Sequence, residues 1–117
     1  MKSDSIIARK SRAFALRIVK LYKYLKRRGV DVMSKQVLRS GTSIGANVSE
    51  GLFAQSREDF ASKNSIALKE ARETYYWLDL LNDAGYLPKT DSTQTLLADC
   101  NELIAMLVST VKTAKKT

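Results

Sequence analysis

Histidine is absent from all 117 residues of this chain. Its absence removes the commonest general base, the usual metal-binding side chain, and every serine–histidine or cysteine–histidine nucleophile pair. A di-iron site in a helical bundle requires Glu-x-x-His pairs, which cannot form here. The sequence also carries neither a P-loop nor a dinucleotide-binding glycine pattern. We therefore expect a protein that is not an enzyme and that needs no cofactor and no metal.

Three glutamates keep one catalytic alternative open. Glu50, Glu70 and Glu73 could hold Mg²⁺ for phosphodiester cleavage, because carboxylate oxygens are ligands that this cation prefers. Arg39 and Lys69 are simpler partners for the same carboxylates. A metal-dependent nuclease is therefore the least favoured function class for this chain.

Cysteine occurs once, at Cys100, so no disulfide can form within the chain and a reducing compartment is expected. Leu96 and Leu103 share a helical face with Cys100, which predicts a core residue rather than a nucleophile. The sequence has no apolar run near the roughly 20 residues that a bilayer-spanning helix needs. The basic residues near the amino terminus argue against a signal peptide. We expect a cytoplasmic protein that does not contact a membrane.

Glycine and proline, which interrupt regular structure, are also scarce. The chain has five glycines and one proline, and no segment shows sustained alternation of apolar and polar residues. This favours an all-α fold. Apolar spacing and stop signals predict helices at about residues 5–28, 34–54, 57–83 and 92–114. The short connections make consecutive helices antiparallel, so we expect one domain, residues 1–117, folded as an up-down-up-down antiparallel four-helix bundle.

Each predicted helix carries one apolar stripe at helical spacing. Ser34 is expected to cap the second helix, and Asp83 to end the third before Gly85 and Pro88. The stripes predict a core made of Ile7, Phe14, Ile18, Leu21, Leu25, Val37, Gly41, Ile44, Val48, Leu52, Phe60, Ala67, Ala71, Leu78, Leu81, Leu96, Cys100, Leu103, Leu107 and Val111.

The second predicted helix is unusually rich in small residues, including Gly41, Gly45 and Gly51. A glycine inside a helix costs about 0.5–1 kcal/mol relative to alanine. Three of them in one helix therefore indicate that a neighbouring backbone approaches closely, against Gly41 and Gly45. Arg39 and Glu50 flank this stretch too closely for a membrane helix pair.

Positive charge is concentrated at the start of the chain. The net charge is +8, and ten of the 20 Lys and Arg residues lie between Lys2 and Arg28, where Asp4 is the only acid. A long cationic stripe on one helix favours a polyanionic partner, most simply nucleic acid. The stripe predicts phosphate contacts from Arg9, Lys10, Arg12, Arg17, Lys20, Lys23, Arg27 and Arg28.

The two middle helices each carry a second patterned face. On the third helix it consists of Ile66, Glu70, Glu73, Trp77 and Leu80. On the second helix it consists of Arg39, Ser43, Asn47 and Glu50. We expect a subunit interface in which charged side chains pair beside Trp77, because buried charges persist only when paired. The alternative is ordinary core around Trp77 with the carboxylates on an exposed face.

Two segments carry a resemblance to a known family. The stretch Arg39-Ser-Gly-Thr-Ser-Ile-Gly-Ala-Asn-Val-Ser-Glu-Gly51 and the stretch Ile66-Ala-Leu-Lys-Glu-Ala-Arg-Glu-Thr-Tyr-Tyr-Trp-Leu78 resemble the "four helix bundle protein" family. That family was first noticed as reading frames within intervening sequences of bacterial 23S ribosomal RNA genes. It is similar to the accessory variability protein of diversity-generating retroelements. The residues that match its motif are Arg39, Asn47, Glu50, Gly51, Glu70 and Glu73.

The resemblance implies a bundle that assembles into a homopentameric ring, with no enzymatic activity. The retroelement relatives have a basic surface and bind nucleic acid and a reverse transcriptase. We therefore expect a homo-oligomer that binds nucleic acid, RNA in preference to DNA. The alternative is a scaffold or adaptor that docks a protein, such as a reverse transcriptase or a ribosomal component, with little nucleic-acid contact.

Overall fold

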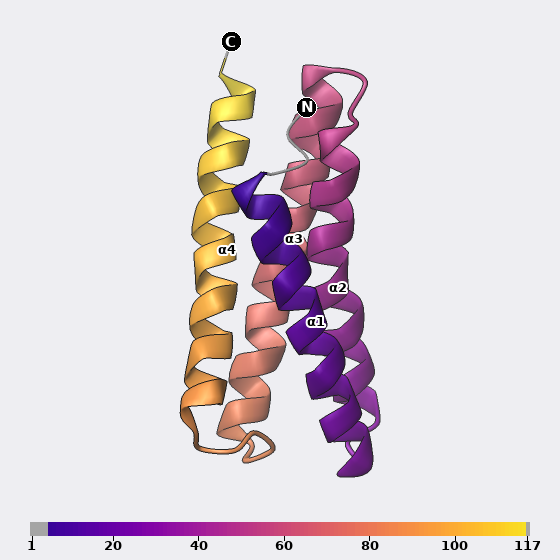
Figure 1. The fold of residues 1–117 in the computed structure, drawn as a ribbon, viewed down its shortest axis with the longest axis vertical. Helices are drawn as coiled ribbons and strands as arrows, with labels where there is room; N and C mark the ends of the chain where they lie inside the picture. The colour runs from indigo at the N-terminus through magenta and orange to yellow at the C-terminus, as the bar shows by residue number, and fades with distance from the viewer. Residues whose placement is uncertain (1–4, 117) are drawn as a thin grey trace.

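The structure is a computed structural model, and it describes residues 5–116. Four α-helices follow one another: α1 (Ile6–Arg27), α2 (Val32–Leu52), α3 (Arg57–Asp83) and α4 (Asp91–Lys115). Within residues 5–116 there is no β-strand. The helices run alternately up and down and form an all-α bundle (Figure 1), which confirms the predicted fold class. Each helix packs on its sequence neighbours, and α1 also contacts α4.

Ser34 does not cap α2, contrary to the expectation from the sequence. Asp31 occupies the cap position and α2 begins at Val32. Gly29, with a φ of +79°, turns the chain directly after α1, so the next helix starts early. Ser34 is therefore buried within the first turn, where its hydroxyl donates to the Asp31 carbonyl at 2.9 Å. The Asp31 carboxylate makes no cap bond and instead lies 3.4 Å from Lys26 Nζ.

The other two interior helix starts have side-chain caps of the usual kind. The Ser56 hydroxyl accepts from the Asp59 amide at 3.0 Å, and the Thr90 hydroxyl accepts from the Thr93 amide at 3.5 Å. Such bonds satisfy amide groups that have no partner inside the helix. After α3, Gly85 takes a φ of +83°, which ends the helix where the sequence indicates.

Fifteen of the twenty predicted core residues are buried, and the other five are half-buried. Four of these five lie toward the end of the bundle where α1 begins, and they are Ile7, Leu52, Phe60 and Val111. There α1 starts short of the ends of the other helices (Figure 1), so less of the interior is covered. The fifth, Leu21, faces a groove between α1 and α4.

Cys100 lies in the core, as the sequence predicts. Its Sγ is 3.5 Å from the Ala71 carbonyl oxygen, to which the thiol donates. Burial, and secondarily the nearby charge of Asp99, raises the pKa of the Cys100 thiol to about 12. The side chain therefore stays a neutral, apolar packing element at physiological pH.

The small residues of α2 allow α1 to pack closely against it. A Cβ added to Gly41 would lie 2.8 Å from Cγ1 and Cγ2 of Ile18, and one added to Gly45 would lie 3.3 Å from the Ser11 carbonyl oxygen. The first distance is a steric overlap with a β-branched, fully buried side chain. The close helix approach expected at Gly41 and Gly45 is thus confirmed.

Replacing Gly41 with alanine should destabilise the fold. Overpacking costs about 1–3 kcal/mol, more than the 0.5–1 kcal/mol gained by removing a helical glycine, so we expect a net loss of about 1 kcal/mol. Urea denaturation followed by circular dichroism measures it. In an Ile18→Ala background the same change should cost less, because the overlapping atoms are gone. A Gly41→Ala variant as stable as the parent would contradict this packing.

Candidate functional site

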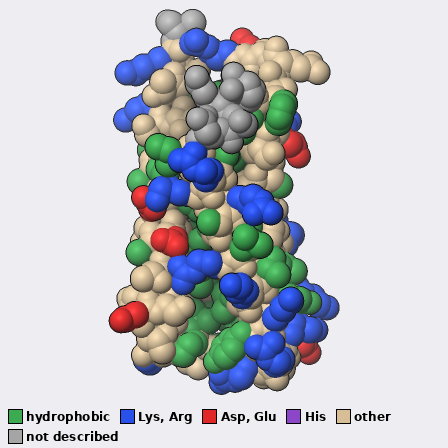
Figure 2. Space-filling view, in the orientation of Figure 1, with side chains coloured by type: hydrophobic (Ala, Val, Ile, Leu, Met, Phe, Trp, Pro, Cys, Tyr) green, Lys and Arg blue, Asp and Glu red, His purple; other side chains and the backbone are tan. Residues whose placement is uncertain are grey.

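The outer face of α1 is a band of cations. Figure 2 shows Lys and Arg side chains spread along this face of the molecule, with few acids among them. α1 itself contains no acidic residue. Four of its cations are exposed and have no hydrogen bond or ion pair within residues 5–116, namely Arg12, Lys20, Lys23 and Arg27. These four residues are called the open cations below.

Two other cations predicted to contact phosphate, Lys10 and Arg17, are paired with acids, and so is Lys26, which was not among the predicted contacts. Lys10 Nζ lies 3.2 Å from Glu102, Arg17 Nη1 lies 2.8 Å from Asp99, and Lys26 Nζ lies 3.4 Å from Asp31. The first two pairs join α1 to α4. They are partly exposed, so each contributes modestly to stability.

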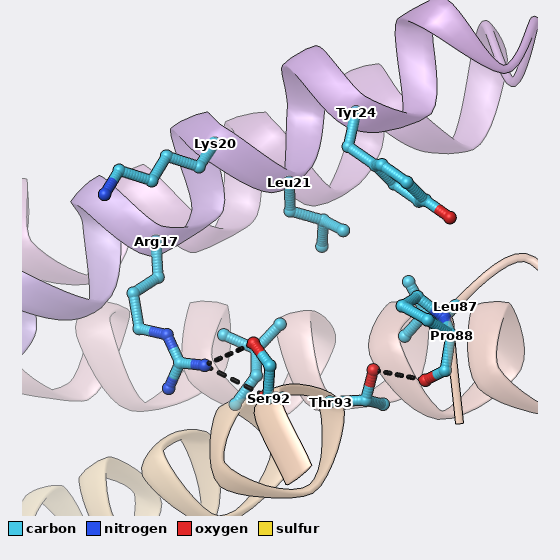
Figure 3. A pocket seen from close by; sticks show the side chains of 9 residues that line it. Arg17, Lys20, Leu21, Tyr24, Leu87, Pro88, Ser92 and Thr93 are labelled. Carbon is cyan, nitrogen blue, oxygen red and sulfur yellow. Dashed lines mark hydrogen bonds between the residues drawn. The ribbon is translucent and has the colours of Figure 1, made fainter. Parts of the chain in front are cut away.

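Arg17 makes the most extensive of these contacts. Besides Asp99, its Nη2 donates to the Ser92 carbonyl at 2.9 Å and to the Thr95 hydroxyl at 3.1 Å. Figure 3 shows the side chain reaching from α1 to the first turn of α4. The Arg17 guanidinium therefore ties two helices together, and a phosphate would have to compete with these bonds.

The remaining two cations of the predicted stripe lie at its ends. Arg28 Nη1 donates to the Tyr24 hydroxyl, and the guanidinium carbon lies 5.4 Å from the centre of the Tyr24 ring. Arg9 is exposed and, together with Arg12, lines a groove between α1 and α2 whose opposite wall includes Ser49 and Phe53.

The acidic partners on α4 were not anticipated from the sequence. Asp99 and Glu102 lie more than 80 residues after the cations they bind. Their spacing of three residues places them one helical turn apart on the same side of α4. That spacing was the only signal available, and it could not indicate which neighbouring helix they face.

A second cluster joins α2 to α3. Arg39 Nη1 donates to Glu70 Oε1 at 3.1 Å, and Arg39 Nη2 donates to Glu73 Oε2. The Trp77 indole also donates to Glu73 Oε2, at 3.0 Å, and the Tyr76 ring meets Trp77 edge-on at 5.2 Å. The structure thus brings together Arg39, Glu70, Glu73 and Trp77, which we call the Arg39 network.

The other residues assigned to the same face lie outside this network. The Ser43 hydroxyl donates to the Arg39 carbonyl at 2.6 Å, and Asn47 Nδ2 donates to the Ser43 carbonyl at 2.9 Å. Both bonds stay within α2. Glu50 is exposed and lies 4.0 Å from Lys63 Nζ on α3.

The Arg39 network is at the surface of the single chain. The Arg39 side chain is 49% exposed, against 17% for Glu70. Glu73 accepts hydrogen bonds from Arg39 and from Trp77. The bond with Arg39, and secondly the bond with Trp77, lower the pKa of Glu73 below its ordinary value. The bond with Glu73 in turn raises the pKa of Arg39. Two exposed apolar residues, Ile66 and Leu80, lie on the same face of α3.

The three glutamates that could have held Mg²⁺ are not gathered into one site. Within residues 5–116, no group of three or more acidic or cysteine residues is arranged to hold a metal ion. Glu70 and Glu73 share Arg39, whereas Glu50 lies beside Lys63. Among the same described residues, no helix combines the length and apolarity required to cross a membrane.

The titration of Glu73 can be followed by fluorescence, because Trp77 is the only tryptophan. Since the pKa of Glu73 is lowered, its stabilising contribution is present at neutral pH and is lost as pH falls below the ordinary value of 4.5. We expect the midpoint of the Trp77 fluorescence change to lie below 4.5 and to rise in Arg39→Gln. Arg72→Gln, an exposed arginine on α3, is the control and should leave it unchanged.

Comparison with known proteins agrees with this architecture. A crystal structure of a protein of unknown function from the S23 ribosomal protein family of Bacteroides thetaiotaomicron has 49% sequence identity and a TM-score of 0.87, covering 92% of this chain and 99% of that one. No curated protein matches the chain. Residues 3–109 match the family described as 23S rRNA-intervening sequence protein. The chain therefore belongs to the 23S rRNA-intervening sequence protein family.

Proposed function

We propose that this protein binds RNA through the outer face of α1. The observation that carries the proposal is the set of open cations, Arg12, Lys20, Lys23 and Arg27, on a helix that has no acid of its own. A partner that brings phosphates could pair with all four without breaking an existing bond. The family description, which refers to 23S rRNA, favours RNA among the polyanions.

The proposed binding is electrostatic. Lysines and arginines that neutralise phosphates release condensed counterions, so affinity falls steeply with salt and depends weakly on sequence. Lys10, Arg17 and Lys26 are held by acids, which leaves the open cations as the principal contacts. No catalytic step is part of this proposal, and the protein acts as a cytoplasmic binding module.

We also propose that the chain forms a homo-oligomer, a pentamer as the family resemblance implies, through the α2–α3 face. The Arg39 network offers directional charged bonds that are only half covered in one chain. Ile66, Leu80 and Tyr76 expose apolar surface around it. In a ring the α1 face would be repeated in every subunit, so that individually weak phosphate contacts act together.

The first experiment is a filter-binding titration of RNA and duplex DNA at several salt concentrations. A variant with Arg12, Lys20 and Lys23 changed to Gln should bind RNA more weakly. The slope of log affinity against log salt should fall by about two, since each phosphate contact in single-stranded RNA contributes about 0.7. Arg17 is left unchanged because replacing it would also break its bond to Asp99, which joins α1 to α4.

The control changes three exposed cations on α3 and α4, Arg72, Lys112 and Lys115, to Gln. It removes the same net charge from another part of the surface. If the control loses as much affinity as the α1 variant, net charge rather than the α1 face governs binding. If wild-type protein binds neither nucleic acid at low salt, the proposal is wrong.

The second experiment measures mass by light scattering. The wild type should give about five times the 13.1 kDa of one chain. Glu70→Gln removes the charge that lies 3.1 Å from Arg39 Nη1 and should lower the mass. Glu102→Gln, which breaks a surface pair on α4, should not. An unchanged mass in Glu70→Gln would show that the Arg39 network does not hold the subunits together.

A protein-docking adaptor, for example for a reverse transcriptase, is the second candidate function. Phe53 is 75% exposed and Val32 is 74% exposed, both at ends of α2. Large apolar side chains that lie open to solvent are typical of contact surfaces. Two observations would favour this candidate. One is a gene that lies beside a reverse transcriptase gene, and the other is an RNA affinity that is the same in the α1 variant as in the wild type.

A further inference from the structure

A groove opens between the carboxyl-terminal half of α1 and the connection from α3 to α4. Figure 1 shows α1 crossing the bundle obliquely, so that this half diverges from α4. The space has a volume of about 380 Å³. Figure 3 shows Leu21 and Tyr24 pointing from α1 toward Leu87 and Pro88, which lie on the opposite side.

The walls of the groove combine apolar and aromatic surface. Leu21, Leu87 and Leu96 supply branched aliphatic carbons, and the half-buried ring of Tyr24 supplies a flat face. The Arg28 guanidinium carbon lies 5.4 Å from the centre of the Tyr24 ring, and Arg28 does not line the groove. The Thr93 hydroxyl is committed to the Pro88 carbonyl at 2.6 Å.

The shape of the groove limits what can enter. Arg17 bridges from α1 to Ser92 at one end, and the α3–α4 connection lies at the other (Figure 3). A helix is about 10 Å across with its side chains and needs a long open channel, which this groove does not provide. The volume is at the lower end of the roughly 300–1,000 Å³ range of small-ligand sites, which suits one flat ring system.

The charge around the groove is positive. None of its lining residues is acidic, and Lys20, an open cation, is one of them. Along α1, Tyr24 lies one turn after Lys20 and one turn before Arg27, so an aromatic face is flanked on both sides by open cations. An aromatic face between cations is the arrangement with which proteins bind a base and its adjoining phosphates.

We propose that this groove receives an unstacked base of single-stranded RNA, with the flanking phosphates on Lys20, Lys23 and Arg27. The inference rests on the proposed RNA binding and adds the strand type and the subsite. A base inside a duplex is paired and stacked, so it cannot enter the groove. The protein should therefore prefer single-stranded RNA to duplex RNA of equal charge.

The test compares an oligouridylate with an abasic ribo-oligomer of the same length and charge, at one salt concentration. Wild-type protein should bind the oligouridylate about tenfold more tightly, the effect of one stacked base. Tyr24→Leu should abolish that preference while keeping the affinity for the abasic oligomer. Tyr24→Phe, which keeps the ring, should retain the preference.

The outcomes separate the two proposals. If both oligomers bind equally to the wild type, or if Tyr24→Leu keeps the preference, the base subsite is wrong and electrostatic RNA binding stands. If neither oligomer binds, the proposed function fails as well. Stronger binding of duplex than of oligouridylate also overturns the subsite.

Methyl NMR of the wild type gives a second readout that does not depend on the folding of a variant. Uridine monophosphate should shift the methyl signals of Leu21, Leu87 and Leu96, which line the groove. Leu68 and Leu107, which do not line it, serve as internal controls. If an acidic, tyrosine-containing peptide shifts these signals and the nucleotide does not, the groove docks protein and the base subsite is excluded.

Discussion

The close approach of α1 to the glycines of α2 is the constraint on which the arrangement of the surface depends. Because Gly41 and Gly45 carry no side chain, Ile18 and the Ser11 backbone settle directly onto α2. α1 is thereby held mainly by α2 and crosses the bundle obliquely, while its contact with α4 is narrow. The narrow contact is bridged by Lys10 and Arg17, and the divergence of α1 beyond Arg17 opens the groove at Tyr24.

This placement separates the cations of α1 that bind α4 from the open cations. Those facing α4 neutralise Asp99 and Glu102 and take part in holding the bundle together. The four open cations have no hydrogen bond or ion pair within residues 5–116. A helix that is uniformly basic in sequence is therefore not uniformly available to a ligand. The proposed interface is narrower than the charge pattern indicates, and it lies nearer the carboxyl end of α1.

The fold could be predicted from the sequence because its determinants are local. Apolar spacing, Gly29, Gly85 and the caps at Ser56 and Thr90 each act within one or two turns. Serine is favoured at cap positions, so the sequence predicts Ser34 as the cap of α2. In the structure Ser34 is instead buried in the first turn, and the sequence does not distinguish these two positions. The sequence placed Arg39, Glu70 and Glu73 on patterned faces and predicted charge pairs between subunits, whereas the structure pairs these three residues within one chain. The bonds from α1 to Asp99 and Glu102 could not be, since they depend on which faces meet in three dimensions.

The buried thiol has a consequence for regulation. The chain has no histidine, and its single cysteine, Cys100, has a pKa raised to about 12, so neither side-chain type changes its charge near neutral pH. The positive charge of α1, which is carried by lysines and arginines alone, is consequently unchanged by mild acidification. The proposed binding to that helix would therefore respond to ionic strength and to competing polyanions rather than to pH.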